Sequence, residues 1–214
     1  FDIVFLPLGA AAFGGAERSI AYLAKGMQER GKRVLILGEP ALKQTAYAKF
    51  IEDLGVPLRW VDWNPEQGLW RNLFFARRVF RSLDADIVQF NISWRPGMWL
   101  IPLVACIMGA SHLIGTMRAM PSFHQDVPRK KHFGFVPGLR LWHLPELCAG
   151  WLWGRLLDIT VSVNGLDFPH RLVRDYGYPA DRLRVVHNGM YFREVPLSED
   201  DRAELRSTLN CGDG

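Results

Sequence analysis

The stretch 13–31, together with the apolar run on each side of it, constrains the fold of this chain most strongly. Residues 2–6 (DIVFL) and 34–37 (VLIL) are short and apolar, as buried strands are. Between them lie a glycine-containing loop, residues 9–15, and a helix that we expect over residues 16–30. A strand, a helix and a second strand in this order form a βαβ unit, which implies a parallel, buried sheet.

Two glycines, Gly14 and Gly15, stand where the expected helix begins. The unpaired N–H groups and the positive end of a helix favour an anion at this place, typically a phosphate. Glycine also lets such an anion approach the backbone closely. Glu17 lies in the first turn, where the helix dipole favours a carboxylate. The alternative is that the glycines only allow the helix to pack tightly on the sheet.

Other glycine-loop chemistries match the letters poorly. A P-loop requires a Lys and a hydroxyl residue where this chain has Gly15 and Ala16. A dinucleotide loop requires G-x-G-x-x-G, which the stretch lacks. Glu39, after the second strand, is the only feature that imitates the ribose-binding acid of an NAD-type oxidoreductase or epimerase.

Strand and helix patterns continue to alternate after the first unit. Helices are expected at 42–54, 69–83, 96–109, 144–157 and 166–176, and strands at 57–61, 86–90, 113–117, 158–163 and 183–187. This alternation predicts an α/β fold with a doubly wound parallel sheet of about seven strands and flanking helices. In such sheets ligands bind beyond the carboxyl ends of the strands.

The composition indicates a globular chain with a mild basic excess. Of its 214 residues 49% are hydrophobic and 22% are charged, and the net charge is +4. This charge suits anionic partners such as nucleotide phosphates or an acidic membrane surface, and we expect no nucleic-acid partner. The three cysteines lie far apart without the spacing of metal ligands, so we expect reduced thiols and no metal site.

Two segments, 96–117 and 129–153, raise the question of a membrane, and a third, 69–83, raises that of an anionic partner. The span 96–117 has no charged residue, but Pro102, Gly109 and the polar pair after it favour a buried helix and strand over a membrane-spanning helix. Arginines in 69–83 lie largely off the apolar stripe of that helix, as a solvated face or a surface for an anionic partner. The segment 129–153 joins a basic run to several Phe and Trp residues, which suits peripheral contact with an anionic membrane, although these rings can also pack under a loop.

The stretch GGAERSIAYLAKGMQERGKRVLIL resembles the opening of the GT-B glycosyltransferases, especially family 4. A second stretch, LDITVSVNGLDFPHRLVRDYGYPADRLRVVHNGMYF, is similar to the family segment that ends in an Asn-Gly turn. DIVQFN and LIGTMR take the places of two further family strands, and the resemblance spans about residues 2–209. The residues at matching positions of the second stretch are Asp158, Ser162, Gly177, Pro179, Arg182, Asn188 and Gly189.

The resemblance implies a Rossmann-like domain over residues 1–190, the N-terminal, acceptor-side half of a GT-B fold. Residues 191–214 would then be an interdomain linker and the start of a C-terminal domain, which in this family holds the donor through an E-x7-E motif. The implied reaction moves a sugar from a UDP- or GDP-sugar to a polysaccharide or glycolipid of the bacterial cell envelope, such as lipopolysaccharide. The resemblance further implies a retaining outcome, no cofactor or metal, and inactivity of this half alone.

The resemblance, with the loop positions, also selects candidate site residues. Arg118 stands where the family often has a His, and because Arg stays protonated it suits a phosphate or an acidic sugar better than proton abstraction. His124 is the spare candidate for a base. The candidates for binding the donor phosphate or the acceptor are Gly14, Gly15, Glu17, Asn91, Arg118, Ser162, Asn188 and Gly189.

Three classes of function therefore remain open at this point. The first is the glycosyltransferase half, in the cytoplasm with peripheral contact at the inner face of the membrane. Its partners would be the acceptor, its own C-terminal domain and an anionic lipid surface. The second is an NAD-type oxidoreductase or epimerase domain. The third is a non-catalytic Rossmann-like module that binds sugar or protein.

Overall fold

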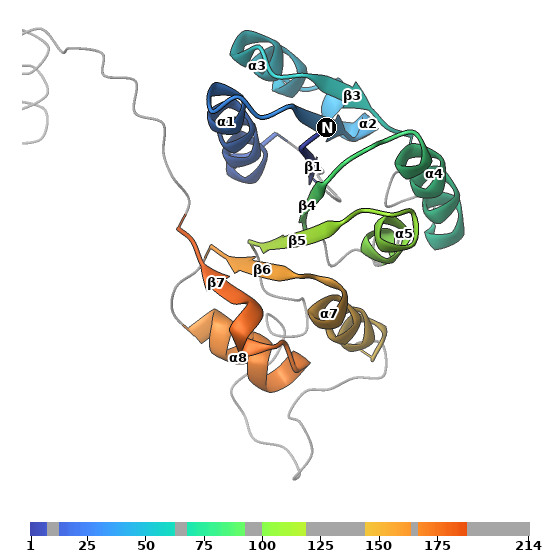
Figure 1. The fold of residues 1–214 in the computed structure, drawn as a ribbon, viewed down its shortest axis with the longest axis vertical. Helices are drawn as coiled ribbons and strands as arrows, with labels where there is room; N and C mark the ends of the chain where they lie inside the picture. Colours follow the sequence, from blue (N-terminus) through green and yellow to red (C-terminus); the bar gives the residue numbers. More distant parts are fainter. Residues whose placement is uncertain (8–12, 63–67, 93–99, 119–143, 164–166, 188–214) are drawn as a thin grey trace, which may run out of the picture.

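The computed structural model describes residues 1–7, 13–62, 68–92, 100–118, 144–163 and 167–187. These residues form one seven-stranded sheet with helices on both faces (Figure 1). The strand order is β3-β2-β1-β4-β5-β6-β7 and every pairing is parallel, so the predicted α/β fold is confirmed. The strands are β1 (Ile3–Pro7), β2 (Val34–Gly38), β3 (Leu58–Trp60), β4 (Ile87–Asn91), β5 (His112–Met117), β6 (Ile159–Ser162) and β7 (Leu183–Val185).

Helices cover the two faces of the sheet unequally. The helices are α1 (Gly15–Glu29), α2 (Pro40–Lys43), α3 (Tyr47–Leu54), α4 (Leu69–Arg81), α5 (Ile101–Ile107), α7 (Leu144–Leu156) and α8 (Asp167–Tyr176). Helices α1 and α3 lie on one face, α4, α5 and α7 lie on the other, and α8 packs beside α7 (Figure 1). Two hydrophobic cores result, one under α1–α3 and one under the remaining helices.

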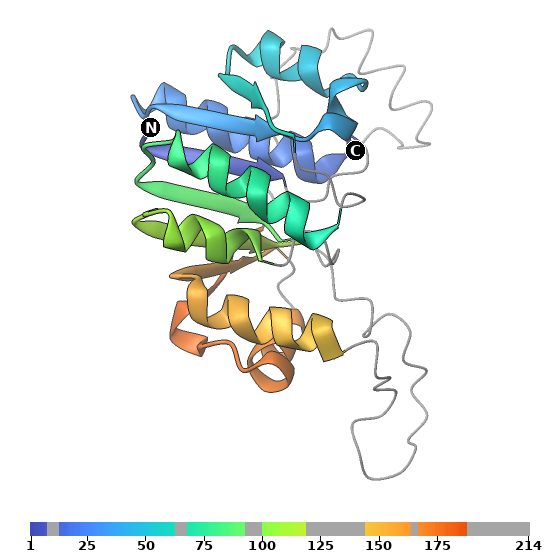
Figure 2. The same ribbon diagram turned by 90° about the vertical axis from the view of Figure 1, so that its right-hand side faces the viewer.

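The sheet is buried because strands that pair on both sides and carry helices on both faces meet no water. All five residues of β1 and all five of β2 are buried. The edge strands β3 and β7 are short and more exposed. Figure 2 shows the strands pointing the same way, so their carboxyl ends meet at one edge.

One sequence prediction was wrong in detail: residues 42–54 are not a single helix. Helix α2 ends at Lys43 and α3 begins at Tyr47. Between them the Thr45 hydroxyl donates to the Leu42 carbonyl at 2.7 Å and accepts from the Tyr47 amide at 3.1 Å. These side-chain bonds replace the helical backbone bonds at the break.

The uncharged span 96–117 is a short helix and a strand in its described part. Helix α5 has seven residues, and Gly109 follows with a φ of 93°, a left-handed conformation that glycine adopts without strain. Within the described ranges, no helix has the length and apolar character needed to cross a membrane.

Candidate functional site

The sheet has a topological switch point between β1 and β4. From β1 the chain passes to β2 and β3 on one side, and the later strands β4–β7 lie on the other. Pro7 and Asn91, the last residues of β1 and β4, are register partners at the carboxyl edge. Open α/β sheets bind their ligands in the crevice at such a point, so this edge is the candidate site.

Arg118 joins three segments at this edge. It follows the last residue of β5, and its Nε donates to Oδ1 of Asn91 at the end of β4, at 3.1 Å. Its Nη2 donates to the Ser19 hydroxyl of α1 at 3.2 Å. The structure therefore brings together two residues that the sequence predicted, Asn91 and Arg118, and adds Ser19.

Glu17 supplies the negative charge of the site. Its side chain is 8% exposed and lies in the first turn of α1. Burial lowers the pKa of the Arg118 guanidinium, and the nearby Glu17 charge acts in the opposite direction. Because a guanidinium ordinarily ionises far above neutral pH, Arg118 stays a cation despite this lowering of its pKa and can bind an anion.

The N-terminus of α1 already holds an anion of its own. The Gly14 amide donates to Oε2 of Glu17 at 2.9 Å. A phosphate arriving at this amide would compete with that carboxylate. The backbone at Gly15 is open, because a Cβ added there would meet nothing within 4 Å. Arg118 is thus the donor best placed to receive a ligand, and the space at Gly15 leaves room beside the start of α1.

The remaining predicted site residues lie deeper or outside the described ranges. Ser162 ends β6 at the same edge, but it is fully buried, and its backbone carbonyl accepts from the Val186 amide at 2.9 Å. Its side chain has no exposed surface for a ligand. His124, Asn188 and Gly189 fall outside the described residues.

A buried polar layer under the site escaped the sequence reasoning. Nε2 of Gln89 donates to the Thr116 hydroxyl at 3.0 Å. Gln89 lies two residues before Asn91 on β4, and Thr116 on β5 lies two residues before Arg118. Residues two apart on a strand share a face, so this pair supports the strand ends that present the site. The signal was present as polar letters inside two apolar strands.

A second buried polar group lies under the start of α3. The Tyr47 hydroxyl is buried without a hydrogen-bond partner, and its pKa is raised by burial and by the charges of Glu17 and Glu39. Glu39 itself is only 1% exposed. A carboxylate that binds a ribose hydroxyl must be accessible, so the position of Glu39 gives no support to an NAD-type site. In the described part of the chain, no group of three or more His, Cys, Asp or Glu residues is placed to hold a metal ion.

A comparison with known families decides the class of protein. The model of Glycosyltransferase Family 4 matches residues 13–191, which is most of the chain. The chain belongs to glycosyltransferase family 4. The family resemblance seen in the sequence motifs is thereby confirmed, and the seven-stranded sheet is the Rossmann-like fold of such an enzyme.

Two solved structures share this fold with the family 4 chain. A glycosyltransferase from Rickettsia africae ESF-5 superimposes with a TM-score of 0.63 at 14% identity, over 100% of this chain and 50% of its own. The apo form of the lipopolysaccharide outer core galactosyltransferase WaaB gives a TM-score of 0.57 at 17% identity, over 94% and 50%. The chain thus spans half the length of these two enzymes. Among curated proteins no significant match is found.

Proposed function

We propose that this chain is the acceptor-side part of an enzyme that moves a sugar from a UDP- or GDP-sugar to a polysaccharide or glycolipid acceptor. The family match supports the reaction class. The observation that carries the proposal is Arg118, a permanent cation held by Asn91 and Ser19 at the switch point of the sheet. We further propose that a second, donor-binding domain completes the site and that this part is inactive without it.

The chemistry follows from the charge that the reaction develops. An acceptor hydroxyl attacks the anomeric carbon of the donor sugar, and the nucleoside diphosphate departs with increasing negative charge. Preorganised donors that face this charge lower the barrier. Arg118 is such a donor on this wall of the site, and the open space at Gly15 leaves room for the diphosphate at the start of α1. Because Arg118 remains protonated, its role is to bind an anion and not to remove the acceptor proton.

We further propose an acceptor class and a location for the enzyme. The galactosyltransferase neighbour is named for the lipopolysaccharide outer core, which supports an envelope glycolipid as acceptor. Nucleotide sugars are cytoplasmic metabolites, so we place the enzyme in the cytoplasm, at the inner face of the membrane where such acceptors are displayed. We expect a retaining outcome, which NMR of the anomeric proton in the product reports.

The test uses the protein encoded by the whole gene and measures UDP or GDP release from a panel of nucleotide sugars with envelope glycan acceptors. We expect release of one nucleotide, and Arg118→Met to lower kcat/KM by roughly a hundredfold, the usual loss for one charge-stabilising donor. Arg30→Gln, at the far end of α1, is the matched control and should retain full activity. Turnover of NADH without nucleotide-sugar turnover would instead establish the oxidoreductase, and saturable sugar binding without turnover the binding module.

A further inference from the structure

Helix α4 presents an outward face made only of aromatic and arginine side chains. Its residues that are exposed to solvent are Trp70, Arg71, Phe74, Arg77, Arg78 and Arg81, and we call them the α4 face. Trp70 is 80% exposed and Phe74 is 65% exposed. The helix contains no acidic residue. Large apolar rings that lie exposed and rimmed by charged residues mark interaction surfaces, so this face is a candidate docking surface.

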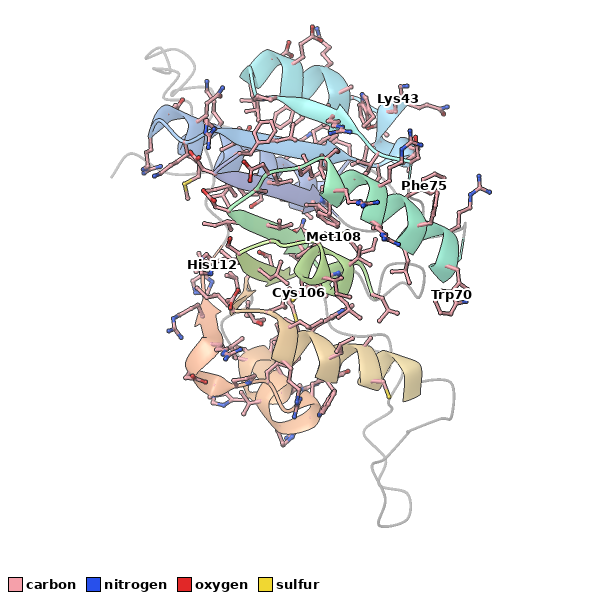
Figure 3. The ribbon with its side chains drawn as sticks, turned by 45° about the vertical axis from the view of Figure 1, so that its right-hand side comes forward. Lys43, Trp70, Phe75, Cys106, Met108 and His112 are labelled. Atoms are coloured by element: carbon pink, nitrogen blue, oxygen red, sulfur yellow. The ribbon has the colours of Figure 1, made fainter. Side chains whose placement is uncertain are left out.

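The spacing of these residues places most of them on one stripe. Residues 70, 74, 77, 78 and 81 follow the i, i+4, i+7 pattern, which aligns side chains along one side of a helix. Ala76 and Phe80, on the opposite side, are buried in the core. Figure 3 shows Trp70 at the outer end of α4, projecting away from the sheet.

The arginines of the α4 face pair with no carboxylate in the part of the chain that the structure describes. Among the described residues, none of the four forms an ion pair. Arg77, Arg78 and Arg81 line an open hollow of about 390 Å³ together with Phe74 and Ser82. Three guanidinium groups around one hollow match the donor set of an anionic phosphate group, because Arg binds phosphate through paired N–H donors. The Ser82 hydroxyl adds no donor, because it already donates to the Val79 carbonyl at 2.8 Å.

The apolar character continues along the same layer of helices. Helix α5 packs beside α4 and α7 packs beside α5 (Figure 1). On these helices Ile107 is 68% exposed, and Trp151 is 51% exposed with the Arg155 guanidinium 3.7 Å from its ring centre. The layer thus repeats the pairing of an exposed apolar side chain with arginine.

We propose that the α4 face docks on an anionic lipid bilayer, with Trp70 and Phe74 in the headgroup region and the arginines on lipid phosphates. Charge complementarity favours this occupant, since the face is purely cationic and an anionic bilayer supplies phosphates over its whole area. Basic residues with Trp and Phe on one helix face are the pattern of helices that lie in a membrane interface.

Docking in this way would bring the candidate site to the membrane. Helix α4 follows β3, so its first turn, which carries Trp70, lies at the carboxyl edge of the sheet, where Asn91 ends β4 and Arg118 follows β5. Figure 2 shows the start of α4 at that edge. Insertion of the aromatic end tilts that edge toward the lipid. Because vesicle binding needs no sugar transfer, this proposal stands or falls independently of the proposed reaction.

The α4 face differs from the membrane segment that the sequence suggested, residues 129–153. Trp153, the last ring of that segment, is 1% exposed and packs in the core, so it is closed to lipid. Of the other rings, Trp151 is exposed in part, while Phe133, Phe135 and Trp142 lie outside the described residues. The described contribution of that segment is therefore Trp151 alone.

Vesicle co-sedimentation of the 214-residue chain tests the proposal, with vesicles of phosphatidylcholine alone and of phosphatidylcholine mixed with phosphatidylglycerol. We expect binding to the anionic vesicles only. Each arginine near an anionic surface changes partitioning by about fivefold, so R77Q/R78Q/R81Q should lower the partition coefficient by roughly a hundredfold. The variant W70S/F74S should bind more weakly and lose its remaining binding in high salt.

The matched control is R30Q/K32Q/K49Q, which removes the same charge from exposed positions on and beside α1 and α3, across the sheet. It should keep most of the binding, and circular dichroism should show all variants folded. The proposal is overturned if the wild type ignores anionic vesicles, if R77Q/R78Q/R81Q binds them as the wild type does, or if the control loses as much. The first of these results would leave the α4 face to an acidic protein partner.

Discussion

At the scale of single residues, Glu17 determines how much of the α1 N-terminus a ligand can use. Its carboxylate accepts from the Gly14 amide and so takes the place of an external anion. We predict that Glu17→Ala frees this amide and raises the affinity for inorganic diphosphate several-fold. The same change should lower the free energy of unfolding by about 1 kcal/mol, because a helix cap is lost.

Two measurements check the Glu17→Ala prediction. Amide chemical shifts of Gly14 and Gly15 during a diphosphate titration report the affinity, and urea unfolding reports the stability. Glu29→Ala removes an equal charge from the exposed end of the same helix and should change the stability by no more than about 0.5 kcal/mol. An unchanged or weaker diphosphate affinity in Glu17→Ala would show that the carboxylate does not compete for this site.

Tyr47 is a residue whose buried hydroxyl links stability to alkaline pH. Its pKa is raised above the ordinary value of 10.0, first by burial and then by the Glu17 and Glu39 charges. The folded state therefore keeps this proton when the unfolded state has lost it. The free energy of unfolding therefore does not depend on this group below pH 10.0 and falls as the pH rises further, by about 1.4 kcal/mol per pH unit.

The variant Tyr47→Phe should remove this dependence. At neutral pH we expect its free energy of unfolding to lie up to about 1 kcal/mol above that of the wild type, because a buried hydroxyl without a partner is costly. Above pH 10.0 its stability should fall less steeply than that of the wild type. Urea unfolding of the wild type and of Tyr47→Phe, each at neutral pH and above pH 10.0, measures how steeply the free energy of unfolding falls with pH in each protein. Identical slopes would mean that Tyr47 already ionises in the folded state near its ordinary pKa.

At the scale of elements, the approach of β5 to the segment after α7 depends on Gly115. A Cβ there would lie 2.4 Å from Cδ1 of Leu157 and 3.2 Å from Cδ1 of Ile92. Leu157 is 1% exposed and has no free space to move into. We predict that Gly115→Ala lowers the free energy of unfolding by about 1–3 kcal/mol through overpacking. Chemical denaturation measures the change.

A second glycine provides the contrast for Gly115→Ala. Gly26 lies inside α1, and a Cβ there would be 3.4 Å from the Arg30 guanidinium, an ordinary contact. Gly26→Ala should therefore stabilise the chain by about 0.5–1 kcal/mol through helix propensity. In a Leu157→Ala background, Gly115→Ala should lower the free energy of unfolding by less than it does in the wild type, because the clash with Leu157 is gone. If Gly115→Ala is as stable as the wild type, the sheet and α7 can separate more easily than their packing implies.

The elements themselves were largely predictable, and the exceptions have physical causes. Buried parallel strands are apolar runs, which made the inner strands visible in the sequence, and the alternation of helices and strands indicated the short edge strands β3 and β7. The position of Asn91 and Arg118 at the carboxyl edge, where the candidate site lies, was predictable because Asn91 ends β4 and Arg118 follows β5. The break between α2 and α3 was missed because it depends on the Thr45 side chain. The contact of Arg118 with Ser19 was missed because it joins residues 99 positions apart, which no local pattern reports.

At the scale of the whole molecule, the strand order sets where the structure opens first. Strands β1 and β4 lie at the centre of the sheet, whereas β3 and β7 are its edges, with three residues each and partial exposure. Edge strands open by local fluctuation, while a central strand opens only when the whole domain unfolds. This distribution follows from the strand order, which the apolar runs alone do not specify.

Hydrogen exchange followed by NMR should therefore separate two classes of amide. We expect β7 and β3 to exchange fastest and to respond little to low urea, because small openings expose little surface. Amides of β1 and β4 should exchange slowest, with a steep urea dependence that converges on global unfolding. Exchange in β1 as fast as in β7 would contradict the order β3-β2-β1-β4-β5-β6-β7, and with it the switch point that positions Arg118.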